Sequence, residues 1–333
     1  MQILPLQCKL QPAARLQSQA FDAAVDVLGL SAGELAWMFG YPGGQSFAWS
    51  ALRNRGIIRV ALAASSCAPK TDDPRFTVEL DDGTVQCCSD QPAELKVLEQ
   101  HDSPSDRLAR SLNLALSQQW ARAGIMLVHA AGVAISGTGV LILGSKASGK
   151  STLTAAVLAA EGQAVSDDWM LLGLGRDGQP RMERMRGFLM LRHSWASETL
   201  LAQPANLQFY TQADRPKYVL AIPEDTGRFP TTHRVDLAVK LLRPRPRPKE
   251  SRSRSAPPHS LMAALMSAGM PLLFGRGFSA ERENLNNLAA QLLNQLETTE
   301  LICGTDLPAH PDLVKRILVT QAVRVCNPVD ASQ

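Results

Sequence analysis

Residues 140 to 152, VLILGSKASGKST, decide how the rest of the chain is interpreted. The apolar run from Val140 to Leu143 predicts a buried strand, and Leu153 to Ala160 predicts a helix. Between them lies Gly144 to Gly149, here called the glycine loop, whose terminal glycines permit the tight path by which backbone N–H groups wrap a phosphate. The helix that follows would direct the positive end of its dipole at the same phosphate.

The glycine loop and the residues after it satisfy the pattern GxxxxGK followed by Ser or Thr. In such loops the lysine reaches the β- and γ-phosphates of a nucleotide, and the next hydroxyl takes a position on Mg²⁺. Lys150 and Ser151 occupy these positions. The alternative, a Gly/Ser turn beside a surface lysine, is disfavoured by the strand and helix predicted on either side. The predicted nucleotide contacts are Gly144, Ser145, Lys146, Ala147, Ser148, Gly149, Lys150, Ser151 and Thr152.

Composition indicates a globular protein with a substantial core, because 45% of the 333 residues are hydrophobic. The net charge is only +3, and residues 243 to 255 alone hold six basic residues and one glutamate. The excess of positive charge is therefore local, and nucleic acid is disfavoured as a partner. No apolar run reaches the roughly 18 residues of a membrane span, and residues 1 to 16 do not resemble a signal peptide.

The cysteines point to a cytoplasmic protein with reduced thiols. None of the six forms a C-x-x-C spacing, and the adjacent Cys87 and Cys88 suit neither a metal clip nor an ordinary disulfide framework. Because the sequence also lacks an apolar run long enough for a membrane span, no membrane partner is expected. A homo-oligomer is left open.

Residues 1 to 104 predict a small α+β domain whose role the sequence does not state. Residues 21 to 38 have helical periodicity, residues 56 to 63 alternate like a strand, and residues 75 to 87 fit a hairpin that turns at Asp82-Gly83. A long helix is then expected from Ser105 to Ala123.

A single strand is expected from Ile125 to Ile135, and it contains His129. Ser136 to Gly139 turns the chain into the strand of the glycine loop, so these two strands should be antiparallel neighbours. A lone histidine in an apolar strand is usually a core residue, so spacing by itself leaves His129 ambiguous.

Asp167 and Asp168 follow a short apolar strand. Two adjacent carboxylates are costly to hold together without a cation, and a magnesium nucleotide would relieve that cost. A right-handed crossover through the loop helix should place this pair beside the glycine loop. Either aspartate could then accept the proton of an incoming hydroxyl while the other supports the metal shell. The alternative is that the pair caps a turn.

The second half of the chain alternates strands, helices and one basic stretch. Strands are expected at 170–174, 181–192, 218–222 and 235–242, with a hairpin turn at 176–178 and a short helix at 194–201. The Pro/Arg/Ser stretch 243–258 predicts a mobile loop, either a solvated linker or a dock for an acidic peptide or nucleic acid. Helices are expected at 260–266 and 279–301, with their apolar stripes in the core.

These features together resemble the bacterial HPr kinase/phosphorylase family, and more closely the HPr-kinase-related serine kinases thought to tailor lasso peptides. The likeness is carried by His129, by GVLILGSKASGKST from Gly139 and by VSDDW from Val165, within residues 110 to 175. It implies an α/β nucleotide core like that of phosphoenolpyruvate carboxykinase, with a mixed sheet and flanking helices. The implied kinase domain is 105–305, followed by a C-terminal helix and tail at 306–333.

The resemblance also implies a reaction, in which ATP and Mg²⁺ phosphorylate a seryl hydroxyl of a small protein or peptide. By carry-over, Asp168 is the general base, Lys150 binds phosphate and His129 belongs to the active site. Ser151 is implied as a metal ligand, with Asp167 as the second aspartate beside the metal.

One family signature is displaced. The family reads Glu-x-Arg-Gly where this chain has Arg184-Met185-Arg186-Gly187, with Glu183 one place off. Arg186 is predicted to contact phosphate, the second metal ligand is left unassigned, and phosphorylase activity is not predicted. A further family arginine has four candidate positions: Arg215, Lys217, Arg228 and Arg234.

The sequence bears on three other functions. A small-metabolite kinase also places an aspartate shortly after its phosphate loop, but such enzymes usually begin near the loop. A GTPase is disfavoured because the motif Asn/Thr-Lys-x-Asp does not occur. A nucleotide-sensing interaction module without transfer activity is favoured by the displaced Glu183.

Overall fold

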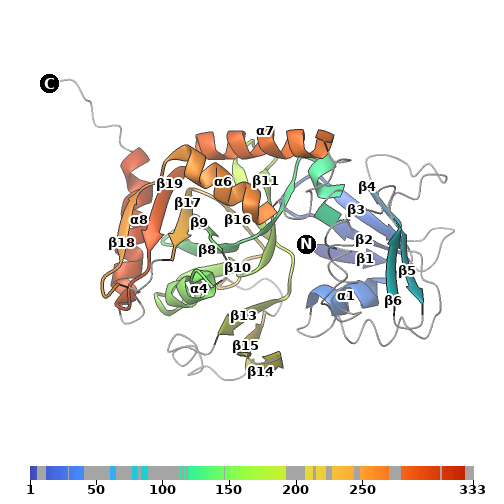
Figure 1. The fold of residues 1–333 in the computed structure, drawn as a ribbon, viewed down its shortest axis with the longest axis horizontal. Helices are drawn as coiled ribbons and strands as arrows, with labels where there is room; N and C mark the ends of the chain where they lie inside the picture. Colours follow the sequence, from blue (N-terminus) through green and yellow to red (C-terminus); the bar gives the residue numbers. More distant parts are fainter. Residues whose placement is uncertain are drawn as a thin grey trace. The chain divides into compact units, whose positions relative to one another are not determined.

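The structure is a computed structural model, and Figure 1 shows its helices and strands. The chain divides into two compact units, residues 1–127 with 270–286 and residues 128–269 with 287–333. The described residues are 1–5, 13–28, 30–40, 61–64, 77–81, 84–88, 113, 116–117, 119–145, 147–192, 207–212, 215–222, 227–243, 248–269, 279–307 and 310–326.

The first unit contains a four-stranded antiparallel sheet, in the order β1 (Gln2–Pro5), β2 (Ala13–Gln17), β3 (Ala24–Leu28) and β4 (Ala61–Ala64). Helix α1 (Ala32–Gly40) begins with a capping box, because the Ser31 backbone N–H and hydroxyl both donate to Glu34 Oε2. The helix predicted over 21–38 is therefore wrong in its first half, which is strand β3. Val25 and Val27 are fully buried. In so short a stretch, the apolar residues of a buried strand cannot be distinguished from the apolar stripe of a helix.

The predicted hairpin in this unit is confirmed. Strands β5 (Thr77–Asp81) and β6 (Thr84–Cys88) pair antiparallel with Asp81 opposite Thr84, and the turn between them lies outside the described residues. Strand β4 overlaps the end of the strand predicted over 56–63. The described positions between 113 and 122 are helical, in agreement with the helix predicted there.

A six-stranded mixed sheet forms the centre of the second unit. Its order is β10 (Gln163–Ser166), β8 (Ala131–Ile135), β9 (Thr138–Leu143), β17 (Leu237–Leu242), β19 (Glu297–Ile302) and β18 (Arg252–Ser255). Strands β9, β17 and β19 are parallel, whereas β8 and β18 run antiparallel to their neighbours. Strand β10 is antiparallel to β8 and so has the direction of β9. The antiparallel pairing predicted for β8 and β9 is confirmed, with Ser136 and Gly137 at positive φ in the turn.

Helices cover both faces of this sheet. Helix α4 (Lys150–Ala159) and helix α8 (Pro311–Cys326) share one buried cluster with alternate residues of β8, β9 and β17 (Figure 1). Helix α6 (Pro258–Gly269) lies on the opposite face, since Lys240, which alternates with the clustered Val239 and Leu241, bonds its Ser260. Helix α7 (Ser279–Gln295) leads into β19.

A second sheet has the order β16 (Thr232–Arg234), β12 (Pro180–Arg184), β11 (Trp169–Leu174) and β7 (Met126–His129). A third sheet orders β13 (Phe188–Arg192), β15 (Arg215–Ala221) and β14 (Leu207–Gln212). The strands predicted as single runs over 125–135 and 181–192 are each two strands in different sheets, with breaks at Ala130 and Met185–Gly187. In 125–135 the run of apolar residues does not reveal the break, because the residues on both sides of it are buried.

Two other expectations are corrected. The loop predicted over 243–258 contains strand β18, because Arg254 forms an ion pair with the buried Glu300 and the strand pairs with β19. The helix predicted over 279–301 ends at Gln295, and its last residues belong to β19. The helix predicted over 260–266 is confirmed as part of α6, while residues 194–201 lie outside the described part. No helix among the described residues is long and apolar enough to cross a membrane.

Candidate functional site

The candidate site forms at one edge of the six-stranded sheet. Strands β9, β10 and β17 run in one direction, so their carboxyl ends meet at this edge. The glycine loop follows β9, and the aspartate pair follows β10. His129 reaches the same edge because the antiparallel β8 begins two residues after it.

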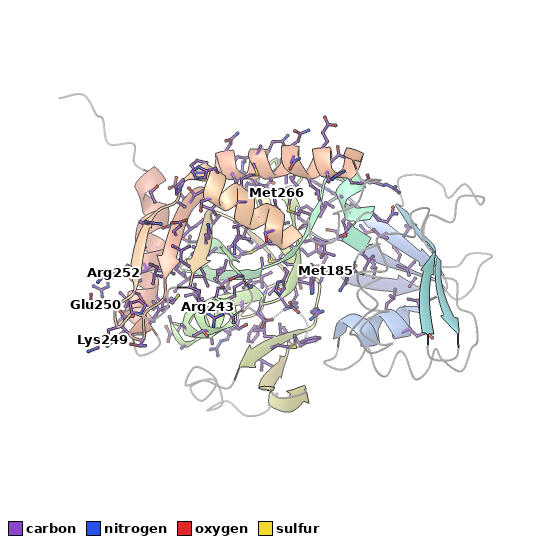
Figure 2. The ribbon with its side chains drawn as sticks, viewed as in Figure 1. Met185, Arg243, Lys249, Glu250, Arg252 and Met266 are labelled. Atoms are coloured by element: carbon purple, nitrogen blue, oxygen red, sulfur yellow. The ribbon has the colours of Figure 1, made fainter. Side chains whose placement is uncertain are left out.

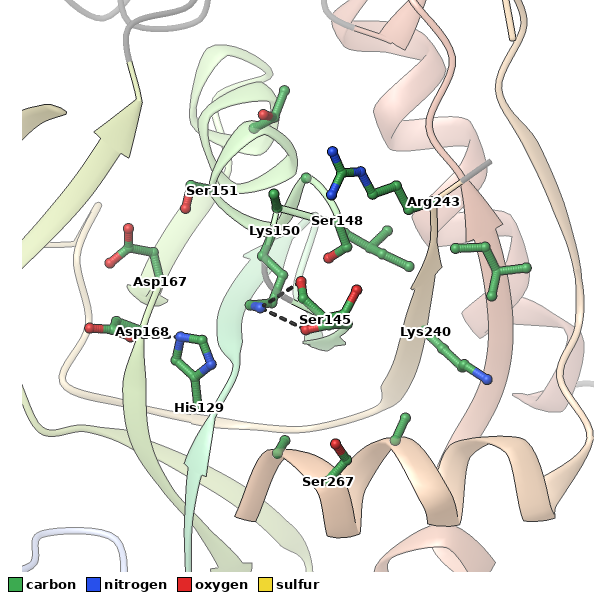
Figure 3. Close-up of a pocket in the computed structure, with 18 of the residues that line it drawn as sticks. His129, Ser145, Ser148, Lys150, Ser151, Asp167, Asp168, Lys240, Arg243 and Ser267 are labelled. Atoms are coloured by element: carbon green, nitrogen blue, oxygen red, sulfur yellow. Dashed lines mark hydrogen bonds and ion pairs between the residues drawn. The ribbon is translucent and has the colours of Figure 1, made fainter. Parts of the chain in front are cut away.

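One pocket of about 1110 Å³ lies at this edge (Figure 3). Its lining includes almost every residue predicted from the sequence, although their segments are separated along the chain. The predicted residues in the lining are His129, Gly144, Ser145, Ala147, Ser148, Gly149, Lys150, Ser151, Thr152, Asp167 and Asp168. Lys146 lies outside the described residues, and Arg186 is not part of the lining.

Glycines allow the loop to fold tightly around Lys150. Gly149 has a φ of 108°, a left-handed conformation that a side chain would strain. A Cβ on Gly144 would lie 2.4 Å from the Ser148 hydroxyl oxygen, so the close approach requires glycine there too. The Lys150 ammonium donates to the Gly144 carbonyl at 2.7 Å and lies 3.5 Å from the Ser145 carbonyl.

The charge on Lys150 is under opposing influences. The side chain is buried, and burial lowers the pKa of Lys150 below its ordinary value. The negative charges of Asp168 and Asp167 act in the other direction and partly restore that pKa. The carboxylate pair is therefore close enough to the lysine to act on it electrostatically.

Asp168 is held from two sides. His129 Nε2 lies 2.9 Å from its Oδ1, and the Arg186 guanidinium pairs with its Oδ2. Its backbone carbonyl accepts the Ala130 N–H at 2.8 Å. This bond joins the break between β7 and β8 to the connection between β10 and β11. The Asp168 side chain is 16% exposed and that of His129 is 43% exposed. The carboxylate is therefore nearly buried, whereas the imidazole next to it is open to solvent. The Trp169 ring lies 5.4 Å from the His129 ring.

Asp167 is buried, and its Oδ2 accepts the Met190 N–H at 2.9 Å. Its carboxylate and the Ser151 hydroxyl are hard oxygen donors of the kind that Mg²⁺ prefers. The described residues contain no group of three or more His, Cys, Asp or Glu arranged to hold a metal. This donor set fits a Mg²⁺ that takes its remaining ligands from water and phosphate, as Mg²⁺ usually does in nucleotide sites.

The displaced signature does not reach the pocket. Glu183 is fully buried in β12, and the Arg186 guanidinium lies against Asp168, with its central carbon 5.6 Å from the centre of the Phe188 ring. A phosphate contact by Arg186 stays a prediction.

The four candidates for a further arginine do not supply one in the described part of the pocket. Arg228 donates to the Leu158 carbonyl, and Arg234 pairs with Asp236. The side chains of Arg215 and Lys217 lie outside the described part of the structure.

Sequence reasoning missed one whole side of the pocket. Strand β17 contributes Lys240, Leu241 and Leu242, and Arg243 follows. Four small residues of α6 complete this side, and we call them the α6 wall: Ala263, Ala264, Ser267 and Ala268. The signal available in the sequence was Lys240, a charged residue inside the otherwise apolar strand LAVKLL.

Comparisons with known proteins found a distantly similar structure and no matching family. No protein family profile matches the chain, and no curated protein matches it. Among solved structures, the HPr(Ser) kinase/phosphatase from Coxiella burnetii is similar, with 15% sequence identity and a TM-score of 0.30. That match covers 60% of this chain and 99% of the other.

Proposed function

We propose that this protein is an ATP-dependent kinase that transfers the γ-phosphoryl group to a serine hydroxyl of a small protein or peptide. The observation that carries the proposal is the position of Asp168. This nearly buried carboxylate contacts His129 and Arg186 and lies in the same pocket as Lys150. Phosphoryl transfer needs a clamp on the phosphates and a group that positions the attacking hydroxyl, and these residues are suited to both tasks.

The clamp is formed by the glycine loop and Lys150. The backbone N–H groups at the start of α4 favour an anion, and the lysine adds a full positive charge. The Lys150 ammonium donates to the Gly144 carbonyl, and its remaining N–H donors are available to a phosphate, which is a charged and stronger acceptor. A Mg²⁺ held with Ser151 and Asp167 would neutralise phosphate charge when bound.

Asp168 is proposed to orient the seryl hydroxyl and accept its proton. The bond from the seryl oxygen to the γ-phosphorus forms as the bond to the β–γ bridging oxygen breaks, and ADP leaves. The proton goes to the Asp168 carboxylate and can pass to solvent through the half-exposed His129. Arg186 keeps the carboxylate in place for this step. The choice of serine rests on the sequence resemblance of residues 110 to 175.

A second candidate is an ATP-binding regulatory module without transfer activity. It is favoured by the burial of Glu183 outside the pocket lining, which leaves Asp167 and Asp168 as the acids that line it among the described residues. In that case ATP would order the site without chemistry.

Labelled ATP and fractionated small peptides test the proposal. The native protein is expected to label a peptide at serine, located by phosphosite mapping, and Asp168→Asn is expected to bind ATP normally while losing about 10²- to 10⁴-fold in transfer. Asp177→Asn, in the exposed turn before β12, is the matched control and should transfer normally. ATP binding without any labelled acceptor or ADP release, unchanged in Asp168→Asn, would favour the regulatory module.

A further inference from the structure

A row of residues crosses the sheet below the glycine loop. Leu143 lies opposite Lys240, Lys240 opposite Glu300, and Glu300 opposite Arg254, on strands β9, β17, β19 and β18. The row begins at the residue that precedes Gly144. It therefore connects the glycine loop with a buried acid that has a cation on each side.

Glu300 and Ser260 hold the Lys240 side chain. The Lys240 ammonium lies 2.6 Å from the Ser260 hydroxyl and 3.6 Å from Glu300 Oε1. The Ser260 hydroxyl donates to the same Glu300 oxygen at 2.7 Å, and Arg254 donates to the other oxygen. The pKa of Glu300 is lowered, by the Ser260 hydroxyl and then by Arg254 and Lys240, so this acid stays ionised.

One carboxylate thus serves two cations, so among the described residues this group holds one more positive than negative charge. Lys240 has three N–H donors, lines the pocket and is 27% exposed, so it has a donor beyond those directed at Ser260 and Glu300. Arg243, also in the lining, adds a second cation on the same side.

The pocket consequently has charged side chains of opposite sign at its two ends. Asp167, Asp168 and His129 lie on one side of Lys150, and Lys240 and Arg243 lie on the other (Figure 3). Strand β10 precedes the aspartates and is three strands away from β17, which is roughly 14 Å. A phosphate chain is attracted by the cations and repelled by the carboxylates. Its α-phosphate end would therefore extend from the glycine loop toward Lys240. Its γ-phosphoryl end is assigned to the other side of Lys150 because the proposed base, Asp168, lies there.

We infer that the nucleotide lies across the strands, with its γ-phosphoryl group near Asp168, its α-phosphate at Lys240 and its nucleoside against the α6 wall. Glu300 is then a positioning residue that holds Lys240 for this contact. The small side chains of the α6 wall leave room for a base and a ribose. The acceptor enters from the opposite end, past Met190 and His129. This inference rests on the proposed binding of ATP, but not on its transfer.

The first test compares AMP, ADP and ATP in competition with a fluorescent ATP analogue. Because all three share the α-phosphate, Lys240→Ala is expected to weaken each of them by a similar factor of about tenfold. Lys240→Arg should restore much of the affinity, and Glu300→Gln should give a smaller, equally uniform loss. Lys249→Ala is the matched control, because Lys249 is exposed on the segment before β18 and outside the pocket lining (Figure 2).

The result that overturns the inference is a loss confined to ATP, which would place the γ-phosphate at Lys240. A Lys240→Ala protein with native affinity for AMP would overturn it as well. Thermal melting checks that each variant is folded, and an unfolded Lys240→Ala leaves the decision to the next test.

The second test fills the α6 wall. Ser267 is exposed on α6 and lines the pocket, so Ser267→Trp should fold and occupy the space assigned to the nucleoside. ATP binding is expected to fall at least tenfold, while inorganic tripolyphosphate binds as to the native protein. Equal effects on the two ligands, or none on ATP, would refute the assigned orientation. Binding that follows the expected pattern without transfer to any acceptor would retain the orientation and reject the kinase proposal.

Discussion

The two ends of the pocket hold charges of opposite sign, and each charge is fixed in a similar way by an oppositely charged side chain and a second polar group. At one end the acid Asp168 is fixed by the cation Arg186 and by His129. At the other end the cation Lys240 is fixed by the acid Glu300 and by Ser260. In each case a partly or fully buried charge is stabilised by partners from other elements, which limits its desolvation cost. The difference in sign gives the pocket a direction, and the glycine loop lies between the two ends.

Removing the lysine between the two ends should have the largest effect. Lys150→Ala is expected to weaken ATP and ADP by about a hundredfold or more, because the β- and γ-phosphates lose a charged partner. AMP should bind nearly as before, in contrast to the uniform loss in Lys240→Ala. Isothermal titration with the three nucleotides measures this, with Lys315→Ala on α8 as a control. An equal loss for AMP would mean that the two lysines do not contact different parts of the nucleotide.

The influence of the acidic end on Lys150 should appear as a pH effect. A phosphate contact needs the charged lysine, so ATP affinity is expected to fall as the pH rises through the lowered pKa of Lys150. Asp168→Asn removes the largest influence that raises this pKa, and the fall in affinity should move to lower pH. Binding is measured from neutral to alkaline pH without Mg²⁺, with Asp177→Asn as the control. Superimposable profiles would show that Asp168 does not act on Lys150.

The glycine loop that separates the two ends can be tested by stability. Gly149→Ala should lower the free energy of unfolding by about 1–2 kcal/mol, because Gly149 is left-handed. No atom lies within 4 Å of an added Cβ, so the cost is conformational. Gly227→Ala has equally open surroundings without a positive φ and should be nearly neutral. Equal urea midpoints for the two variants would contradict the strain at Gly149.

The smallest effect is expected at the cationic end, in the acid dependence of stability. The folded state lowers the pKa of Glu300, so its stabilisation is present above the ordinary value of 4.5 and is lost as the pH falls through the lower folded value. Glu300→Gln should therefore be less stable than the native protein at neutral pH and lose less stability on acidification. Glu297→Gln, in the same strand, is the control. If the free energy of unfolding falls equally with acidification in the native protein and in Glu300→Gln, Glu300 does not have this role.

Local patterns were sufficient for much of the candidate site. The glycine loop is a contiguous motif whose path is set by its own glycines, so its residues and the helix after it follow from the sequence. The antiparallel β8–β9 pair follows from the tight turn at Ser136 and Gly137 for the same reason. The aspartate pair was found because two adjacent carboxylates after an apolar strand are chemically unusual.

Other features depend on partners that are distant in the sequence. The break at Ala130 separates two buried strands whose apolar residues look alike, and it is set by the sheet that each strand joins. Arg252 to Ser255 resembles a solvated loop until β19 supplies its backbone partners and Glu300 supplies a charge for Arg254. Lys240 enters the pocket for a similar reason, because its register with Leu143 and Glu300 is decided between strands.

The glycine loop, its lysine and the two acids could be identified from the sequence, because each is recognised by residues that are neighbours in the chain. The direction of the pocket, in contrast, depends on how the strands pair. Strand pairing sets which distant side chains share a row, and the buried Glu300 in that row is stabilised by a cation on each side.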